Sequence, residues 1–243
     1  AGGAYVQVSR RDPRYLELSD GSPYIPVGLN LIAPPGRDET QGLKQYETWL
    51  DKLAANGGNY FRAWLSSPFW DVEDTQCGEY REPKARRIDA MLAMARERNL
   101  RVKMTMEHFH SIGGGTQAWA DKPLHHVANG GTAESIADFF DGERSRAQFR
   151  KKIAWYAGRY GDRPEIFGWE LWNEINAVRG GDYLAWTEVM LAELQKRFPR
   201  NLCMQSMGSF DTGRTRENYR RHSLMEDNDL AQIHRYLDLG AAL

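Results

Sequence analysis

Strand-like and helix-like segments alternate along most of the 243-residue chain, and this order limits the folds that the chain can adopt. Strands that alternate with helices favour a parallel sheet, because each parallel neighbour is reached through a helical crossover. Polar side chains stand at the strand ends, which favours a (β/α)8 TIM barrel in the α/β class, with about six βα units visible. We expect strands at 24–31, 59–65, 100–109, 166–174, 201–207 and 230–236, and helices at 42–55, 83–98, 143–160, 182–198 and 214–222.

Two further segments complete the expected organisation. Residues 5–8 and 15–18 alternate polar and apolar side chains, which predicts a small N-terminal hairpin that could cover the barrel floor. Residues 111–142 are glycine-rich and are expected to be mostly irregular, as a lid or a cleft wall. The first strand is not followed by Gly-x-Gly-x-x-Gly, which argues against dinucleotide binding.

Composition excludes several classes of partner. Lys and Arg number 32 against 33 Asp and Glu, so no nucleic-acid footprint and no basic membrane patch is expected. No apolar run reaches the roughly 20 residues of a membrane helix. Cys77 and Cys203 lie far apart and in no metal-ligand spacing, which argues against a disulfide framework.

The segment 167–176 (FGWELWNEIN) carries the strongest functional signal. It reads as a buried strand that stops at Asn173 and Glu174, where a barrel places its active site. A carboxylic acid at this position suits general acid/base catalysis of glycoside cleavage. The amide of Asn173 can donate to a sugar hydroxyl, typically the 2-OH.

Arg62 stands out because it is a charged residue in an otherwise apolar strand. A buried guanidinium needs a partner, since an unpaired buried charge is costly. Glu170 lies four residues before Glu174, and period-two alternation places both on one face. We infer an Arg62–Glu170 pair beneath the catalytic carboxylates, or an Arg62 aimed at a nucleophile.

Other strand ends carry hydrogen-bonding side chains. His108 and His110 end the third strand, and His234 and Tyr236 end the sixth. Asn30 ends the first strand, and all five suit contacts to sugar hydroxyls. A rival interpretation is a barrel metallohydrolase that uses His108, His110 and His234, with Glu174 completing the site.

Tryptophans are candidate sugar-stacking platforms. Trp119 is favoured because it lies in the long irregular segment, and Trp64, Trp70 and Trp172 are further candidates. Trp172 can also simply pack within the barrel.

Together these positions resemble glycoside hydrolase family 5 of clan A. The family has an Arg on the second strand, a His ending the third, Asn-Glu ending the fourth and His-x-Tyr on the sixth. The matching residues here are Arg62, His108, Asn173, Glu174, His234 and Tyr236. Residues 20–30 also resemble the first-strand entry of mannanase- and cellulase-type members. The resemblance implies retaining hydrolysis of a β-linked polysaccharide or oligosaccharide, without metal or organic cofactor, in a secreted or periplasmic protein.

The sequence departs from the family at the nucleophile. The family's nucleophile is a Glu ending the seventh strand, followed by a Trp at the eighth, whereas the last strand expected here is the sixth. Glu107, Asp211 and Asp238 are possible stand-ins. We therefore expect residues 1–243 to form a single barrel catalytic domain that is C-terminally incomplete. The alternative is a non-catalytic glycan-binding barrel that lacks its nucleophile.

Overall fold

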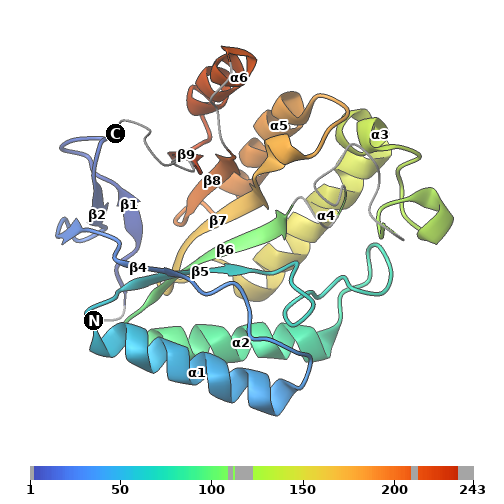
Figure 1. Ribbon diagram of the computed structural model, residues 1–243. Helices are drawn as coiled ribbons and strands as arrows, with labels where there is room; N and C mark the ends of the chain where they lie inside the picture. The colour runs from blue at the N-terminus through green and yellow to red at the C-terminus, as the bar shows by residue number, and fades with distance from the viewer. Residues whose placement is uncertain (1–2, 109–111, 113–122, 209–212, 235–243) are drawn as a thin grey trace, which may run out of the picture.

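A parallel sheet of six strands forms the centre of the molecule (Figure 1). The computed structural model describes residues 3–108, 112, 123–208 and 213–234. The strands follow one another in chain order, and every neighbouring pair is parallel, as in a partial (β/α)8 barrel. They are β4 (Gly28–Asn30), β5 (Tyr60–Trp64), β6 (Arg101–His108), β7 (Ile166–Asn173), β8 (Leu202–Met207) and β9 (Leu230–Ile233). The predicted fold class is confirmed, and each of the six strands of the sheet lies within or overlaps a predicted strand.

Helices connect these strands and cover the outer face of the sheet (Figure 1). Side-chain caps fix where several begin: Asp38, Ser135 and Asp182 each accept a hydrogen bond from a backbone N–H in the first turn. The helices are α1 (Glu39–Ala55), α2 (Glu82–Glu97), α3 (Ile136–Asp141), α4 (Glu143–Tyr160), α5 (Tyr183–Arg197) and α6 (Gly213–Ser223), with 3-10 turns η2 (Val127–Asn129) and η3 (Ile175–Ala177).

The predicted N-terminal hairpin is confirmed and gains a third strand. β1 (Val6–Val8), β2 (Leu16–Leu18) and β3 (Pro23–Tyr24) form an antiparallel sheet. Val6 and Tyr24 pack against Phe167, Leu202 and Met204, at the starts of β7 and of β8. The small sheet therefore covers the N-terminal end of the barrel, opposite the strand ends that carry the polar groups.

One predicted segment differs from the structure, and a second contains a short helix that was not predicted. The strand expected at 24–31 is divided, because its start pairs with β2 and its end pairs with β5. The stretch 111–142, expected to be mostly irregular, contains the short helix α3, in which Phe139 and Phe140 are buried. A six-residue helix is too short to show its period in the sequence.

The edge strand β4 approaches β5 very closely. A Cβ added at Gly28 would lie 1.7 Å from the backbone oxygen of Tyr60, so only glycine fits this position. Ile25, Val27 and Leu29 are exposed along the same edge. An apolar groove of about 590 Å³ lies beside it, between residues 29–33 and the C-terminal half of α1.

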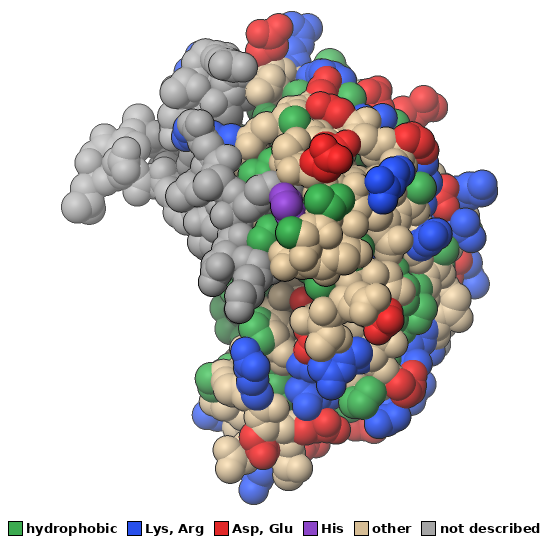
Figure 2. Space-filling model, turned by 90° about the vertical axis from the view of Figure 1, so that its right-hand side faces the viewer, with side chains coloured by type: hydrophobic (Ala, Val, Ile, Leu, Met, Phe, Trp, Pro, Cys, Tyr) green, Lys and Arg blue, Asp and Glu red, His purple; other side chains and the backbone are tan. Residues whose placement is uncertain are grey.

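The face of the molecule drawn in Figure 2 is rich in charged side chains. Figure 2 shows Lys and Arg interspersed with Asp and Glu over the described part of one face. Among the described helices, none has both the length and the apolar character that crossing a membrane requires.

Candidate active site

A cleft of about 470 Å³ opens at the C-terminal ends of the strands. Its lining comes from β4, β5, β7 and the residue after β9, so four separate strands contribute. The lining residues are Asn30, Ile32, Arg62, Trp64, Asn173, Glu174 and His234. The cleft thus brings together five of the polar strand-end residues that the sequence singled out, namely Asn30, Arg62, Asn173, Glu174 and His234.

Glu174 occupies an unusual backbone position at the end of β7. Its φ is +53°, in the left-handed region, and its backbone N–H donates to Ser206 Oγ at 3.2 Å. Such a conformation costs about 1–3 kcal/mol in a non-glycine residue and is often found at functional sites. The carboxylate is 14% exposed, and its Oε1 lies 2.8 Å from His234 Nδ1. Glu174 therefore reaches the cleft with one oxygen already bound to His234.

Arg62 and Glu170 form the pair that the sequence predicted. Arg62 Nε and Nη2 donate to the two carboxylate oxygens of Glu170, each at 2.8 Å. Arg62 Nη2 also donates to Asn173 Oδ1 at 2.8 Å, which fixes the orientation of that amide. Arg62 thus links the buried floor of the site to Asn173, the neighbour of Glu174.

A second cation, Lys103 on β6, shares Glu170 with Arg62. Lys103 Nζ lies 3.1 Å from Glu170 Oε2, which also accepts from the Thr105 hydroxyl at 2.8 Å. Burial opposes ionisation of Glu170, but the charges of Arg62 and Lys103 hold its pKa well below the usual value. Burial lowers the pKa of Lys103 to about 8, and Glu170 opposes that shift. Two cations therefore face one buried carboxylate directly beneath the cleft.

Trp64 lines the cleft, and His108 lies behind it. His108 Nδ1 lies 2.6 Å from Ser66 Oγ, and its ring stacks on Trp64 with centroids 5.1 Å apart. His108 thus covers one face of Trp64, the Arg62 guanidinium carbon lies 5.6 Å from the centroid of the same ring, and Trp64 still contributes to the lining of the cleft. A sugar-stacking role for Trp64 stays a prediction.

The structure corrects two other platform predictions. Trp172 is fully buried and packs against Phe149 and Trp186, on the side of the outer helices. Trp70 is also fully buried, in edge contact with Tyr46. Neither indole can reach a ligand in the cleft. His110, Trp119 and Tyr236 lie outside the described residues, as do Asp211 and Asp238.

Strict alternation along β7 does not hold, which explains the error at Trp172. Glu170 and Asn173 both contact Arg62, although they are three residues apart. Trp172, which alternation would place with Glu170, instead faces the helices. The left-handed backbone of Glu174 then brings its carboxylate to the cleft.

The geometry of the described histidines does not favour the metallohydrolase interpretation. Both ring nitrogens of His234 are engaged, Nδ1 with Glu174 and Nε2 with Gln232 at 2.7 Å. Metal binding by His234 would therefore require one of these hydrogen bonds to break. His108 and His234 belong to no group of three potential metal ligands among the described residues.

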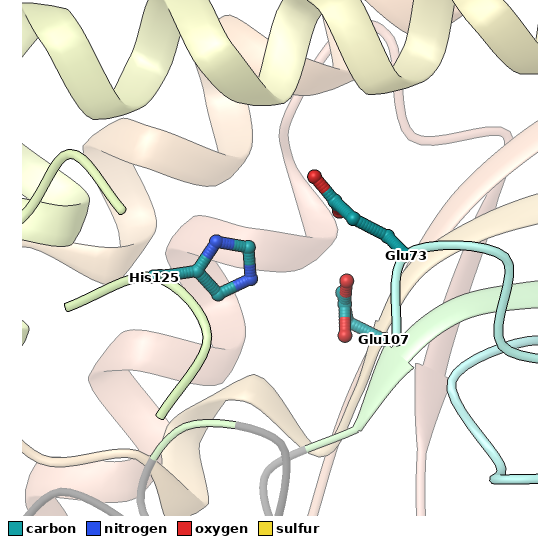
Figure 3. Close-up of side chains that lie close together, drawn as sticks. All are labelled: Glu73, Glu107 and His125. Atoms are coloured by element: carbon teal, nitrogen blue, oxygen red, sulfur yellow. The ribbon is translucent and has the colours of Figure 1, made fainter. Parts of the chain in front are cut away.

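A buried cluster on the helix side of β6 was missed by sequence reasoning. Figure 3 shows the side chains of Glu73, Glu107 and His125 gathered around one space, with ligand atoms within 4.8 Å of one another. Lys152 from α4 pairs with Glu73 at 2.9 Å and also with Glu107. An ammonium group thus already holds the two carboxylates, so the cluster is an ion-pair network. The prediction of Glu107 as a stand-in nucleophile is therefore wrong, because the carboxylate of Glu107 is paired with Lys152.

Asp71 borders this network and gives a pH-dependent prediction. Burial raises the pKa of Asp71 to about 7. The positive charge of Lys152 lowers this pKa, and the negative charge of Glu107 raises it further. The folded state thus binds the proton more tightly than the unfolded state, and stability falls as pH rises towards 7. A difference of about three pKa units corresponds to roughly 4 kcal/mol, so we expect Asp71→Asn to stabilise the protein by up to about that amount above pH 7 and to have little effect near pH 4. Urea unfolding at both pH values tests this, and a stabilisation that is equal at both would contradict it.

The fold and the cleft together define a partial (β/α)8 barrel with its polar groups gathered at the C-terminal strand ends. Comparison with curated proteins places it beside mannanases, although no family model matches the chain. It is 26% identical over 178 residues to mannan endo-1,4-beta-mannosidase 4 of Oryza sativa subsp. japonica, covering 67% of this chain and 37% of that protein. It is 26% identical over 146 residues to mannan endo-1,4-beta-mannosidase A of Podospora anserina, covering 54% and 36%.

Solved structures show the same relationship. A glycoside hydrolase family 5 mannosidase from Rhizomucor miehei superposes with a TM-score of 0.68 at 18% identity, covering 93% of this chain and 60% of that one. A β-1,4-D-mannanase from Cryptopygus antarcticus gives a TM-score of 0.57 at 12% identity, covering 87% and 63%. These findings confirm the resemblance to a mannanase-type barrel of family 5. The chain spans little more than a third of the length of the curated relatives it matches.

Proposed function

We propose that this chain carries the acid/base half of a glycosidase centre that cleaves β-linked mannan with retention of configuration. The observation that carries the proposal is the position of Glu174, in the cleft and hydrogen-bonded to His234 at 2.8 Å. Asn173, oriented by Arg62, lies beside it. The similarity to mannan endo-1,4-beta-mannosidases supports mannan as the substrate class.

The chemistry follows from the groups present. Glu174 gives its proton to the glycosidic oxygen as the bond between that oxygen and the anomeric carbon breaks, and a second carboxylate attacks that carbon. Glu174, now ionised, then takes a proton from water, whose oxygen displaces the second carboxylate. Asn173 is placed to donate to a sugar hydroxyl, and His108 and Tyr236 are proposed as further substrate contacts.

The second carboxylate is not among the described residues that line the cleft, where Glu174 is the sole acid. A retaining mechanism needs that group about 5 Å from Glu174. Arg62 and Lys103, which share Glu170, provide a positive field that would favour a second anion here. The alternative, a glycan-binding barrel without catalysis, is favoured if no such carboxylate completes the site.

The test is digestion of β-1,4-mannan by the full chain, with cello-oligosaccharides as the comparison substrate. We expect shorter manno-oligosaccharides on chromatography, released with the β-anomeric configuration in NMR spectra recorded during the reaction. Release of the α-anomer would contradict retention. Calorimetry that detects mannan binding without any product would select the non-catalytic alternative.

A further inference from the structure

A continuous hydrogen-bonded chain runs from the buried floor of the site to Glu174. Lys103 Nζ donates to Gln232 Oε1, Gln232 Nε2 lies 2.7 Å from His234 Nε2, and His234 Nδ1 lies 2.8 Å from Glu174 Oε1. Lys103 is 2% exposed, while Gln232 and His234 are half-buried. Sequence reasoning identified His234 but not the two residues behind it.

Donor and acceptor chemistry determines which group donates at each step of this row of hydrogen bonds. A lysine ammonium group can only donate, so the amide oxygen of Gln232 must face Lys103. The amide nitrogen of Gln232, which can only donate, then faces His234 Nε2. Nε2 must therefore accept, and in a neutral imidazole the proton is left on Nδ1, which faces Glu174.

We propose that Gln232 is a positioning residue that, anchored by Lys103, sets the tautomer of His234 and makes it a hydrogen-bond donor to Glu174. Glu174 Oε1 is then an acceptor, and the acid proton of Glu174 is carried on Oε2. This directs the proton of the reacting carboxyl group to one defined oxygen, away from His234. The catalytic consequence rests on the proposed function, whereas the tautomer of His234 does not.

The variant Gln232→Glu replaces the amide nitrogen that donates to His234 with a carboxylate oxygen that accepts, while the side chain keeps its size and shape. The new carboxylate can accept from Lys103 but not donate to His234, so Nε2 must be protonated, and Nδ1 keeps its own proton as long as it donates to Glu174. The charged groups around this position are Lys103 on β6, Arg62 on β5, Glu170 on β7 and, beyond His234, Glu174. The ammonium group of Lys103 faces the new carboxylate directly, so we expect the variant to fold.

The first measurement is the 15N NMR spectrum of the six histidines in the full chain, with His234→Asn identifying the resonances of His234. In the wild type we expect a protonated Nδ1 and an unprotonated Nε2. In Gln232→Glu we expect both nitrogens protonated, and in Gln232→Met a mixture of tautomers. A wild-type His234 protonated on Nε2 alone overturns the inference, whether or not the protein hydrolyses glycans.

The second measurement is the pH dependence of kcat/KM. An imidazolium beside Glu174 favours its ionised form, so the alkaline limb should move to lower pH by about one unit in Gln232→Glu. Gln41→Glu adds the same charge on the exposed surface of α1 and should leave the profile unchanged. An unshifted limb in Gln232→Glu, with wild-type His234 resonances, contradicts the positioning role. Absence of hydrolysis in every variant contradicts the proposed function and leaves the NMR result to decide the tautomer.

Discussion

Glu174→Gln should reduce hydrolysis of β-1,4-mannan by about 10²- to 10⁴-fold, the usual contribution of a positioned general acid/base. The amide keeps the size of the carboxyl group and can still accept the hydrogen bond from His234. It cannot deliver a proton to the leaving oxygen. The loss should therefore appear in kcat, measured by reducing-sugar release, while the thermal midpoint stays close to that of the wild type.

Leaving-group chemistry separates this role from a purely structural one. Aryl glycosides with acidic phenol leaving groups need little proton transfer, so the variant should form the glycosyl-enzyme from them at a partly restored rate. Glu134→Gln, which changes an exposed carboxylate outside the cleft, serves as the matched control and should behave as wild type. Unchanged turnover of mannan by Glu174→Gln would remove Glu174 from the mechanism.

The sequence predicted the fold well because its signals are local and repeated. The apolar stripe between Glu143 and Tyr160 gave α4 with both ends correct. The pair of Arg62 and Glu170 could be predicted across 108 residues because a charged side chain in an apolar strand requires a partner. The apolar stripe determined the bounds of α4, and the need to neutralise a buried charge determined the partner of Arg62.

The rest of the site depends on contacts that no short segment encodes. Gln232 looks like an ordinary strand residue until Lys103 and His234 are placed on either side of it. Trp172 was misassigned because two residues in β7 depart from alternation, and the left-handed backbone of Glu174 carries no sequence signal of its own. Such features arise from packing between distant elements, which a single sequence does not specify locally.

The network on the helix side of β6 gives the largest expected effect on stability. Lys152 is 3% exposed and pairs with both Glu73 and Glu107. Burial opposes the charge of Lys152, but the two carboxylates hold its pKa well above the usual value. Removing one partner of a buried ion pair typically costs about 3–5 kcal/mol, because the remaining charge stays buried without compensation. We therefore expect Lys152→Met to lower the free energy of unfolding by about that amount at neutral pH.

The pH dependence of this deficit tests its cause. In the wild type, burial opposes ionisation of Glu73, but the charge of Lys152 lowers the pKa of Glu73 below its usual value. The ion pair therefore stabilises the folded state at pH values above the pKa of Glu73 in the unfolded chain. This stabilisation is lost as the pH falls through the pKa of Glu73 in the folded state. In Lys152→Met the uncompensated Glu73 binds a proton more tightly when folded, so the variant gains stability on acidification. The deficit measured by urea unfolding should shrink between about pH 7.5 and pH 5.

Lys151→Met, at the neighbouring exposed position of α4, should change stability by less than about 0.5 kcal/mol. A deficit independent of pH would point to lost packing of the lysine chain rather than to unpaired carboxylates.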